Sequence, residues 1–355
     1  MHVTEGAAGA ATGGGTGRAA TARRRVGPYT LITALDDPRT GIPVPERRYI
    51  ARGADGRYTV LLSLPNPGAD PRRFLAEAEG SRYLLGPCAA PATALAALGA
   101  TAPGGTAPRE IAWYARPYLP ALPLPTALAV HGGPLPERTV RALGVALAET
   151  LAVLHGQGLT FAGVSPAAVL LTADGPRLSC YGAVRAAAPD GTPRSGLPGL
   201  EAGSLPPEQA SGGRPRPMGD VYALGATLAY AATGHTTPER EELPAALRTV
   251  LGRCLTRDPG ARPQLAELIA ALEADAPGAP AAPPAPAAPP APAAPPGPGG
   301  PVGMLPGMLP GRVIAALAHQ SATVLMAETP VLAAEASAGP VPSQPSQPSH
   351  RPSQN

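Results

Sequence analysis

The residues that most limit the chemistry of this chain are its cations and its thiols. All 28 residues counted as lysine plus arginine are arginine, because the sequence contains no lysine. Arginine is not a neutral replacement for lysine at a phosphate site, since its planar fork needs a different geometry from a compact ammonium group. Cys88, Cys180 and Cys254 lie far apart without C-x-x-C spacing. This spacing indicates free thiols in a reducing compartment.

Residues 161–171 have the frame of a catalytic loop whose chemical groups are replaced. They follow a Leu-His-Gly-Gln-Gly-Leu sequence at 154–159 and read Phe-Ala-Gly-Val-Ser-Pro-Ala-Ala-Val-Leu-Leu. Both segments resemble bacterial Ser/Thr protein kinases, in which the loop usually reads H-R-D-L-K-P-x-N-V-L-L. The resemblance places the family's catalytic Asp on Gly163, its Lys on Ser165 and its metal-binding Asn on Ala168.

Each of these replacements removes a group that phosphoryl transfer needs. Glycine cannot accept a proton from a substrate hydroxyl, serine brings no charge to the phosphate, and alanine cannot bind a metal ion. The family's metal-binding D-F-G resembles Cys180-Tyr181-Gly182 here, and a thiol is a poor ligand for Mg²⁺. Cys180 as a reactive thiol is the alternative, but no adjacent His or Lys activates it, so we expect a small half-buried residue.

The N-terminal part also resembles this family, in the order and spacing of its elements. Residues 58–63 stand in the place of V-A-I-K, with the lysine position near Leu62. Glu77, in a helix expected over 71–85, matches the glutamate that normally pairs with that lysine. It is expected to pair with an arginine or to face solvent. Residues 36–43 replace the glycine-rich phosphate loop, and their two carboxylates and prolines disfavour phosphate.

Residues that build the kinase fold, by contrast, are present. Glu208, in a Pro-Pro-Glu sequence, resembles the glutamate of A-P-E, and Arg262 resembles its buried ion-pair partner. Asp220 begins a D-V-x-x-L-G sequence, and the resemblance implies that it holds the catalytic-loop backbone by hydrogen bonds. The residues expected to be structural are Glu77, Phe161, Tyr181, Gly182, Glu208, Asp220 and Arg262.

The elements that position these residues follow from the apolar spacing. Strands are expected at 29–32, 48–52, 58–62 and 111–118. The proline-rich run 119–123 is expected to be a connector. Helices are expected at 137–156, 219–233, 244–255 and 263–273, with a hairpin over 169–180. The fold class is therefore α+β, a bilobal protein-kinase-like fold with a small β-rich N-lobe, a mainly helical C-lobe and disordered termini.

The domain organisation follows from shifts in composition. We predict a disordered tail over 1–27 and a kinase-like domain over 28–275, with the N-lobe at about 28–118 and the C-lobe at about 119–275. After it we predict a Pro/Ala-rich linker at 276–310, a short helix at 311–338 and a disordered tail at 339–355.

Composition and charge argue against several classes of protein. The net charge of +3 is small and the arginines are scattered. The triplet 23–25 fits a solvated tail, so no nucleic-acid partner is expected. No run reaches about 18 uninterrupted apolar residues, and the N-terminus lacks an apolar core, so we expect neither a membrane span nor a secretory signal. The skewed composition suggests a GC-rich bacterial genome and a cytoplasmic protein.

The predicted function is that of a pseudokinase. It is expected not to be an enzyme but a binding or regulatory module for a protein partner, with no catalytic, cofactor-binding or metal-binding residues. One alternative is a Ser/Thr protein kinase with atypical catalytic residues that uses ATP and Mg²⁺. Asp174 would then be its carboxylate, although an Asp-Gly turn explains this residue more simply. Arg177, Arg185 or Arg194 would contact phosphate. A third alternative is a membrane-proximal or scaffold protein whose Pro-rich segment binds an aromatic groove.

Overall fold

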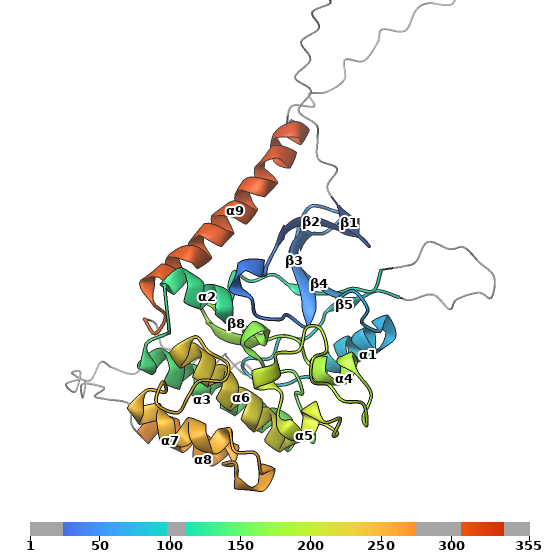
Figure 1. Cartoon of the computed structure of the whole chain (residues 1–355). Helices are drawn as coiled ribbons and strands as arrows, with labels where there is room; N and C mark the ends of the chain where they lie inside the picture. The colour runs from blue at the N-terminus through green and yellow to red at the C-terminus, as the bar shows by residue number, and fades with distance from the viewer. Residues whose placement is uncertain (1–23, 98–110, 275–306, 337–355) are drawn as a thin grey trace, which may run out of the picture.

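The computed structural model describes residues 24–97, 111–274 and 307–336 of the 355-residue chain. Within them the chain forms a sheet-rich N-lobe and a helical C-lobe, and a long helix near the C-terminus runs alongside (Figure 1). This is the bilobal α+β fold that the sequence predicts.

The N-lobe is built on one antiparallel sheet with the strand order β1-β2-β3-β4-β6-β5. Its strands are β1 (Arg25–Val26), β2 (Tyr29–Ala34), β3 (Glu46–Arg52), β4 (Thr59–Pro65), β5 (Ala94–Leu95) and β6 (Tyr114–Pro117). The prediction of a disordered tail over 1–27 is wrong at its end, because β1 pairs with β2. Residues 1–23 lie outside the described residues.

Helix α1 (Pro71–Ser81) packs beside this sheet and carries Glu77. It begins as predicted, because Asp70 accepts hydrogen bonds from two backbone N–H groups of the first turn and a proline stands at the first helical position. It ends before the predicted residue 85. The Ser81 hydroxyl accepts a hydrogen bond from the backbone of Ala92 at 3.1 Å, which ties the helix end to the next segment.

The C-lobe surrounds one long buried helix, α3 (Glu137–Gly156). The helices around it are α2 (Leu124–His131), α4 (Ala183–Ala187), α5 (Pro207–Ala210), α6 (Pro217–Thr233), α7 (Ala245–Cys254) and α8 (Leu265–Ala274). Gly144 permits their close approach, since a Cβ there would lie 2.6 Å from Leu272 and 2.9 Å from Leu228. Within the described residues, α3 alone is long and apolar enough to cross a membrane, and 61% of that window is buried in the domain.

A second, three-stranded sheet joins the lobes. It consists of β7 (Ala121–Pro123), β8 (Val169–Thr172) and β9 (Gly175–Leu178), in that order. The prediction that 119–123 is only a connector is therefore wrong. The prolines are accommodated because β7 is an edge strand and does not need every N–H group for pairing.

Helix α9 (Gly311–Ala336) lies outside the kinase-like domain in sequence but packs on it in space. Figure 1 shows it passing α2 and continuing toward the N-lobe sheet. Val313 and Leu317 are buried in the C-lobe core. Val324 is buried with apolar residues of both lobes.

Candidate functional site

The face of the N-lobe sheet that looks toward the C-lobe carries an unusual number of polar side chains. Side chains alternate between the two faces of a strand. Arg48 in β3 is paired with Ser63 in β4, and Ser63 with Tyr114 in β6. Glu46 and Arg116 stand two residues from members of this row and share its face. None of these five residues was predicted to be a site residue, although the period-two pattern of β3 places Glu46 and Arg48 on one face.

The position predicted to match the family's lysine lies on the other face. Leu62 packs against Tyr29, Ala51 and Ala115 in an apolar cluster on the outer side of the sheet. Ser63, one residue later, is the β4 side chain that points between the lobes. A shift of one residue exchanges the two faces of a strand, and the motif spacing alone did not fix that register.

Glu46 organises the first of two buried polar networks. Its carboxylate accepts hydrogen bonds from the Tyr114 hydroxyl at 2.6 and 2.8 Å and from the Ser63 hydroxyl at 2.9 Å. The Arg116 guanidinium pairs with the same carboxylate at 3.2 Å and donates to the Tyr114 oxygen at 2.7 Å. Both charged side chains are 5% exposed, so this ion pair is shielded from water.

Arg48 organises the second network and links the two lobes. Its fully buried guanidinium pairs with Asp36 and donates to the Ser179 hydroxyl at 2.7 Å. Burial alone would lower the pKa of Arg48, but Asp36 and its neighbours outweigh burial and raise it. The segment that replaces the glycine-rich loop therefore supplies the carboxylate, Asp36, that pairs with Arg48.

Cys180 lies beside this second network and behaves as a neutral thiol. Burial, with a smaller contribution from Glu46, raises the pKa of Cys180 to about 12. At neutral pH the group is protonated, so it is neither a good nucleophile nor a metal ligand. Among the described residues, no group of three or more His, Cys, Asp or Glu side chains is arranged to hold a metal ion.

The catalytic-loop positions are occupied by small residues in close contact. A Cβ on Gly163 would lie 2.1 Å from the carbonyl oxygen of Cys180, so only glycine fits. The Ser165 hydroxyl accepts a hydrogen bond from the backbone of Ala168 at 3.3 Å and caps a short 3-10 turn. Ala168 is fully buried. These three residues pack and cap the loop.

Asp220 holds the backbone of this loop. One carboxylate oxygen accepts from the backbone of Phe161 at 2.7 Å and the other from Ala162 at 2.8 Å, while His155 bonds to the first at 2.9 Å. Ala162 has a φ of 53°, a strained backbone for a residue with a side chain. The buried aspartate stabilises that conformation.

Glu77 is paired with an arginine from the C-lobe. Arg185 in α4 contacts both carboxylate oxygens of Glu77 at 2.8 to 3.0 Å and stacks on the Tyr181 ring at 4.9 Å. Tyr181 in turn meets Phe161 edge to face, with 5.6 Å between the ring centroids. A Cβ on Gly182 would lie 2.0 Å from a Glu77 oxygen, so glycine is required beside this pair. From the sequence, Glu77 was expected either to pair with an arginine or to face solvent, and in the structure it pairs with an arginine.

Glu208 and Arg262 form the ion pair that the family resemblance implies. The guanidinium contacts the two carboxylate oxygens at 2.7 and 2.9 Å, and its side chain is fully buried. Burial alone would raise the pKa of Glu208, but the hydrogen bonds from Arg262 outweigh it and the net pKa is lowered. Arg262 also donates to three backbone carbonyls, of Met218, Thr256 and Arg257.

The groups considered for an atypical kinase lie apart from one another. Asp174 stands in the β8–β9 turn, where its backbone bonds to the Thr172 hydroxyl. Arg185 is held by Glu77, and Arg194 is buried with Asp190 and two backbone carbonyls. Arg177 donates to the neighbouring carbonyl of Pro176. The structure does not bring these residues together.

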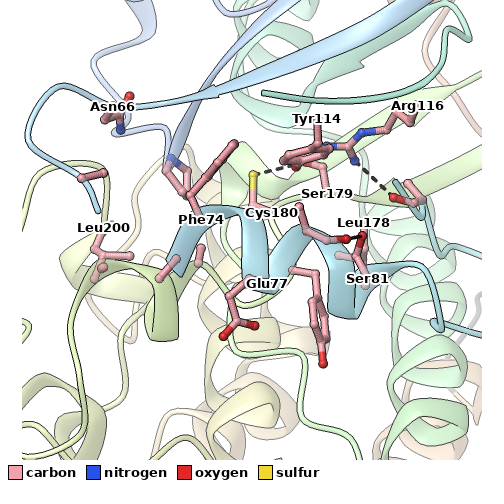
Figure 2. Close-up of a pocket in the computed structure, with 18 of the residues that line it drawn as sticks. Asn66, Phe74, Glu77, Ser81, Tyr114, Arg116, Leu178, Ser179, Cys180 and Leu200 are labelled. Atoms are coloured by element: carbon pink, nitrogen blue, oxygen red, sulfur yellow. Dashed lines mark hydrogen bonds between the residues drawn. The ribbon is translucent and has the colours of Figure 1, made fainter. Parts of the chain in front are cut away.

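A cavity of about 50 Å³ lies between α1, the sheet and the Cys180 segment. Figure 2 shows Tyr114, Arg116, Ser179 and Cys180 gathered on one side of α1, with Glu77 pointing away on the other side of the helix. Pockets that enclose small organic ligands usually measure about 300 to 1,000 Å³. In this conformation the cavity is large enough for a few water molecules.

Sequence comparison shows which known proteins this domain is similar to. No family model matches the sequence. The probable serine/threonine-protein kinase PkwA of Thermomonospora curvata is 31% identical over 275 residues, which cover 72% of this chain and 35% of that protein. The domain is homologous to actinobacterial serine/threonine protein kinases. AfsK of Streptomyces coelicolor is a further relative of this kinase-fold domain, with 29% identity over 70% of this chain and 32% of AfsK. The chain spans about a third of the length of these curated relatives.

The solved structures agree on the fold. The kinase domain of Mycobacterium tuberculosis PknI superimposes with a TM-score of 0.52 and 22% sequence identity, covering 71% of this chain and 97% of that domain. The bilobal kinase fold is thereby established for the described domain.

The prediction that this chain is not an enzyme is contradicted by these relatives. Proteins 29 to 36% identical to it are named as serine/threonine protein kinases, which points to an enzyme. The prediction depended on three replaced side chains in the catalytic loop, on the D-F-G and V-A-I-K positions, and on the missing glycine-rich loop. The similarity extends over 275 residues and includes the whole scaffold that carries those motifs.

Proposed function

We propose that this kinase-fold domain works as a binding or regulatory module in serine/threonine kinase signalling, with a protein as its partner. The observation that carries the proposal is the pairing of charges where the lobes meet. The pairs are Arg48 with Asp36, Arg116 with Glu46, and Arg185 with Glu77.

This pairing supports the proposal through the needs of a metal–nucleotide complex. Protein kinases hold ATP phosphates with a lysine and hold Mg²⁺ with an aspartate and an asparagine. Here the cations on the N-lobe face already have carboxylate partners, and Asp36 and Glu46 would repel phosphate. We further propose that neither ATP nor Mg²⁺ is a resident cofactor, and that the domain acts in the cytoplasm.

Phosphotransfer from ATP is the second candidate, and the names of the relatives favour it. It requires the lobes to separate and Arg48 or Arg116 to exchange its carboxylate partner for phosphate. The catalytic base would have to come from a position other than Gly163.

Calorimetric titration of the full-length protein with ATP, with and without Mg²⁺, tests the two candidates. Under the proposed function we expect no heat of binding and no change in melting temperature. A ligand at 100 times its dissociation constant would stabilise the fold by about 2.7 kcal/mol and raise the melting temperature by roughly 5 °C or more. Mg²⁺-dependent binding of that kind would overturn the proposal, and a phosphotransfer assay would then follow.

A further inference from the structure

Helix α9 is attached to the C-lobe through its first turns. Val313 is fully buried and Leu317 is 4% exposed, and both belong to the C-lobe core. The Arg312 guanidinium donates to the backbone carbonyl of His131, at the end of α2, at 3.3 Å. Just before the helix, the carbonyl of Met308 accepts from the Thr139 hydroxyl at 2.6 Å. The start of α9 is therefore anchored by both apolar and polar contacts.

The middle of α9 forms hydrogen bonds with the backbone of the segment that connects the lobes. The Gln320 side-chain amide donates to the carbonyl of Ala121 at 2.9 Å and accepts from the N–H group of the same residue at 2.9 Å. Its oxygen also accepts from the Tyr118 hydroxyl at 2.9 Å. These three bonds occupy both lone pairs and one of the two N–H groups of the amide, and they fix the rotation of the helix on the connecting segment.

Val324, four residues after Gln320, brings α9 into contact with an apolar cluster where the lobes meet. It is 5% exposed and belongs to a cluster with Leu35, Ile50 and Leu61 of the N-lobe and Leu170 of the C-lobe. A single side chain of α9 is therefore buried together with residues of both lobes.

The contact residues form one face of the helix. Positions 313, 317, 320 and 324 recur at the spacing of α-helical turns, as expected for a helix that docks along a groove. Met326, by contrast, is 72% exposed. The sequence pattern of α9 is thus suited to binding this domain and leaves its other face to solvent.

We propose that α9 is an intrachain clamp that packs Val324 against apolar residues of both lobes and limits how far the lobes separate. Because α9 is tethered to the domain through residues 275–306, its rebinding is intramolecular and is favoured by a high effective concentration. Any ligand or partner that needs the lobes further apart must loosen the cluster around Val324, and by reciprocity α9 docking weakens its binding.

Hydrogen–deuterium exchange of the full-length chain tests the clamp. Val324→Asp places a charge in an apolar cluster, so we expect it to speed exchange at 311–327, 118–121 and 48–52 by about ten-fold or more. Exchange in α3 should not change. Met326→Asp, on the exposed face of the same helix, is the matched control and should behave as wild type.

Two results would overturn the proposal. One is unchanged protection of 311–327 in Val324→Asp. The other is release of α9 without faster exchange at 48–52 and 118–121, which would make α9 a passive appendage. If Val324→Asp also loosens α3, the milder Gln320→Ala decides, because it removes three hydrogen bonds at the edge of the groove and leaves the core intact. Wild-type exchange in Gln320→Ala would then reject the clamp.

Discussion

Two ion pairs of this domain each contain a buried arginine, but they lie in different parts of the molecule and differ in the burial of the carboxylate, which is 31% exposed in Glu208 and 5% exposed in Glu46. Arg262 and Glu208 sit in the C-lobe, where the kinase resemblance implies such a pair. Arg116 and Glu46 sit between the lobes, where a kinase would hold phosphates and metal ions. The same type of interaction therefore holds together the C-lobe scaffold in one place and the N-lobe face that looks toward the C-lobe in the other.

The comparison between the two ion pairs is tested most strongly by a substitution at Glu46. Glu46→Ala leaves Arg116 as a buried cation without its carboxylate and deprives Tyr114 and Ser63 of their acceptor. We expect a loss of about 3–5 kcal/mol in the free energy of unfolding, measured by urea denaturation.

Arg262→Ala is the comparator, and a similar loss is expected for it. The exposed pair of Arg253 and Glu267 supplies the matched control, with both side chains more than half exposed. Arg253→Ala should cost at most about 1 kcal/mol. If Glu46→Ala leaves the free energy of unfolding unchanged or raises it, the network between the lobes does not stabilise the fold. The two ion pairs would then differ in their contribution to stability.

A second test concerns Gly163, where the catalytic-loop segment packs against the Cys180 segment. Gly163→Ala places a Cβ against the Cys180 carbonyl, so we expect a loss of about 1–3 kcal/mol from overpacking. Gly156→Ala, at a helical glycine with open space around it, should be neutral or slightly stabilising. Thermal unfolding of both variants measures the difference. Equal stability of the two variants would show that the loop tolerates a side chain at 163.

The smallest effect is expected from the titration of Glu208. Its pKa is lowered in the folded state, so its contribution to stability is present above its ordinary value of 4.5 and is lost as the pH falls through the folded pKa. The stability difference between wild type and Glu208→Gln should therefore shrink below about pH 4.5. Urea denaturation from pH 7 to pH 3 measures it. A difference that stays constant over this range would contradict the lowered pKa.

The sequence was sufficient for elements whose pattern is local. The helix predicted over 137–156 is confirmed as α3, because its apolar residues recur at helical spacing over five turns. The β3 and β4 strands were likewise found from their composition and the turn between them. The start of α1 was predicted from Asp70, whose side chain caps it.

Long-range geometry was not accessible in the same way. The pairing of Glu77 with Arg185 joins residues 108 positions apart, and several arginines were equally suitable in sequence. The strand register that directs Ser63 instead of Leu62 between the lobes depends on pairing with β3 and β6. The docking of α9 depends on a groove formed only after both lobes have folded. These features are properties of tertiary packing.

The contact between Gly163 and the Cys180 carbonyl also bears on how this domain can be redesigned. Cys180 has a positive φ of 63°, and its carbonyl accepts a hydrogen bond from Ala183, so the segment cannot easily move aside. A side chain introduced at 163 would therefore need a second, compensating change near Cys180. The two segments form one design unit, in which neither can be altered alone.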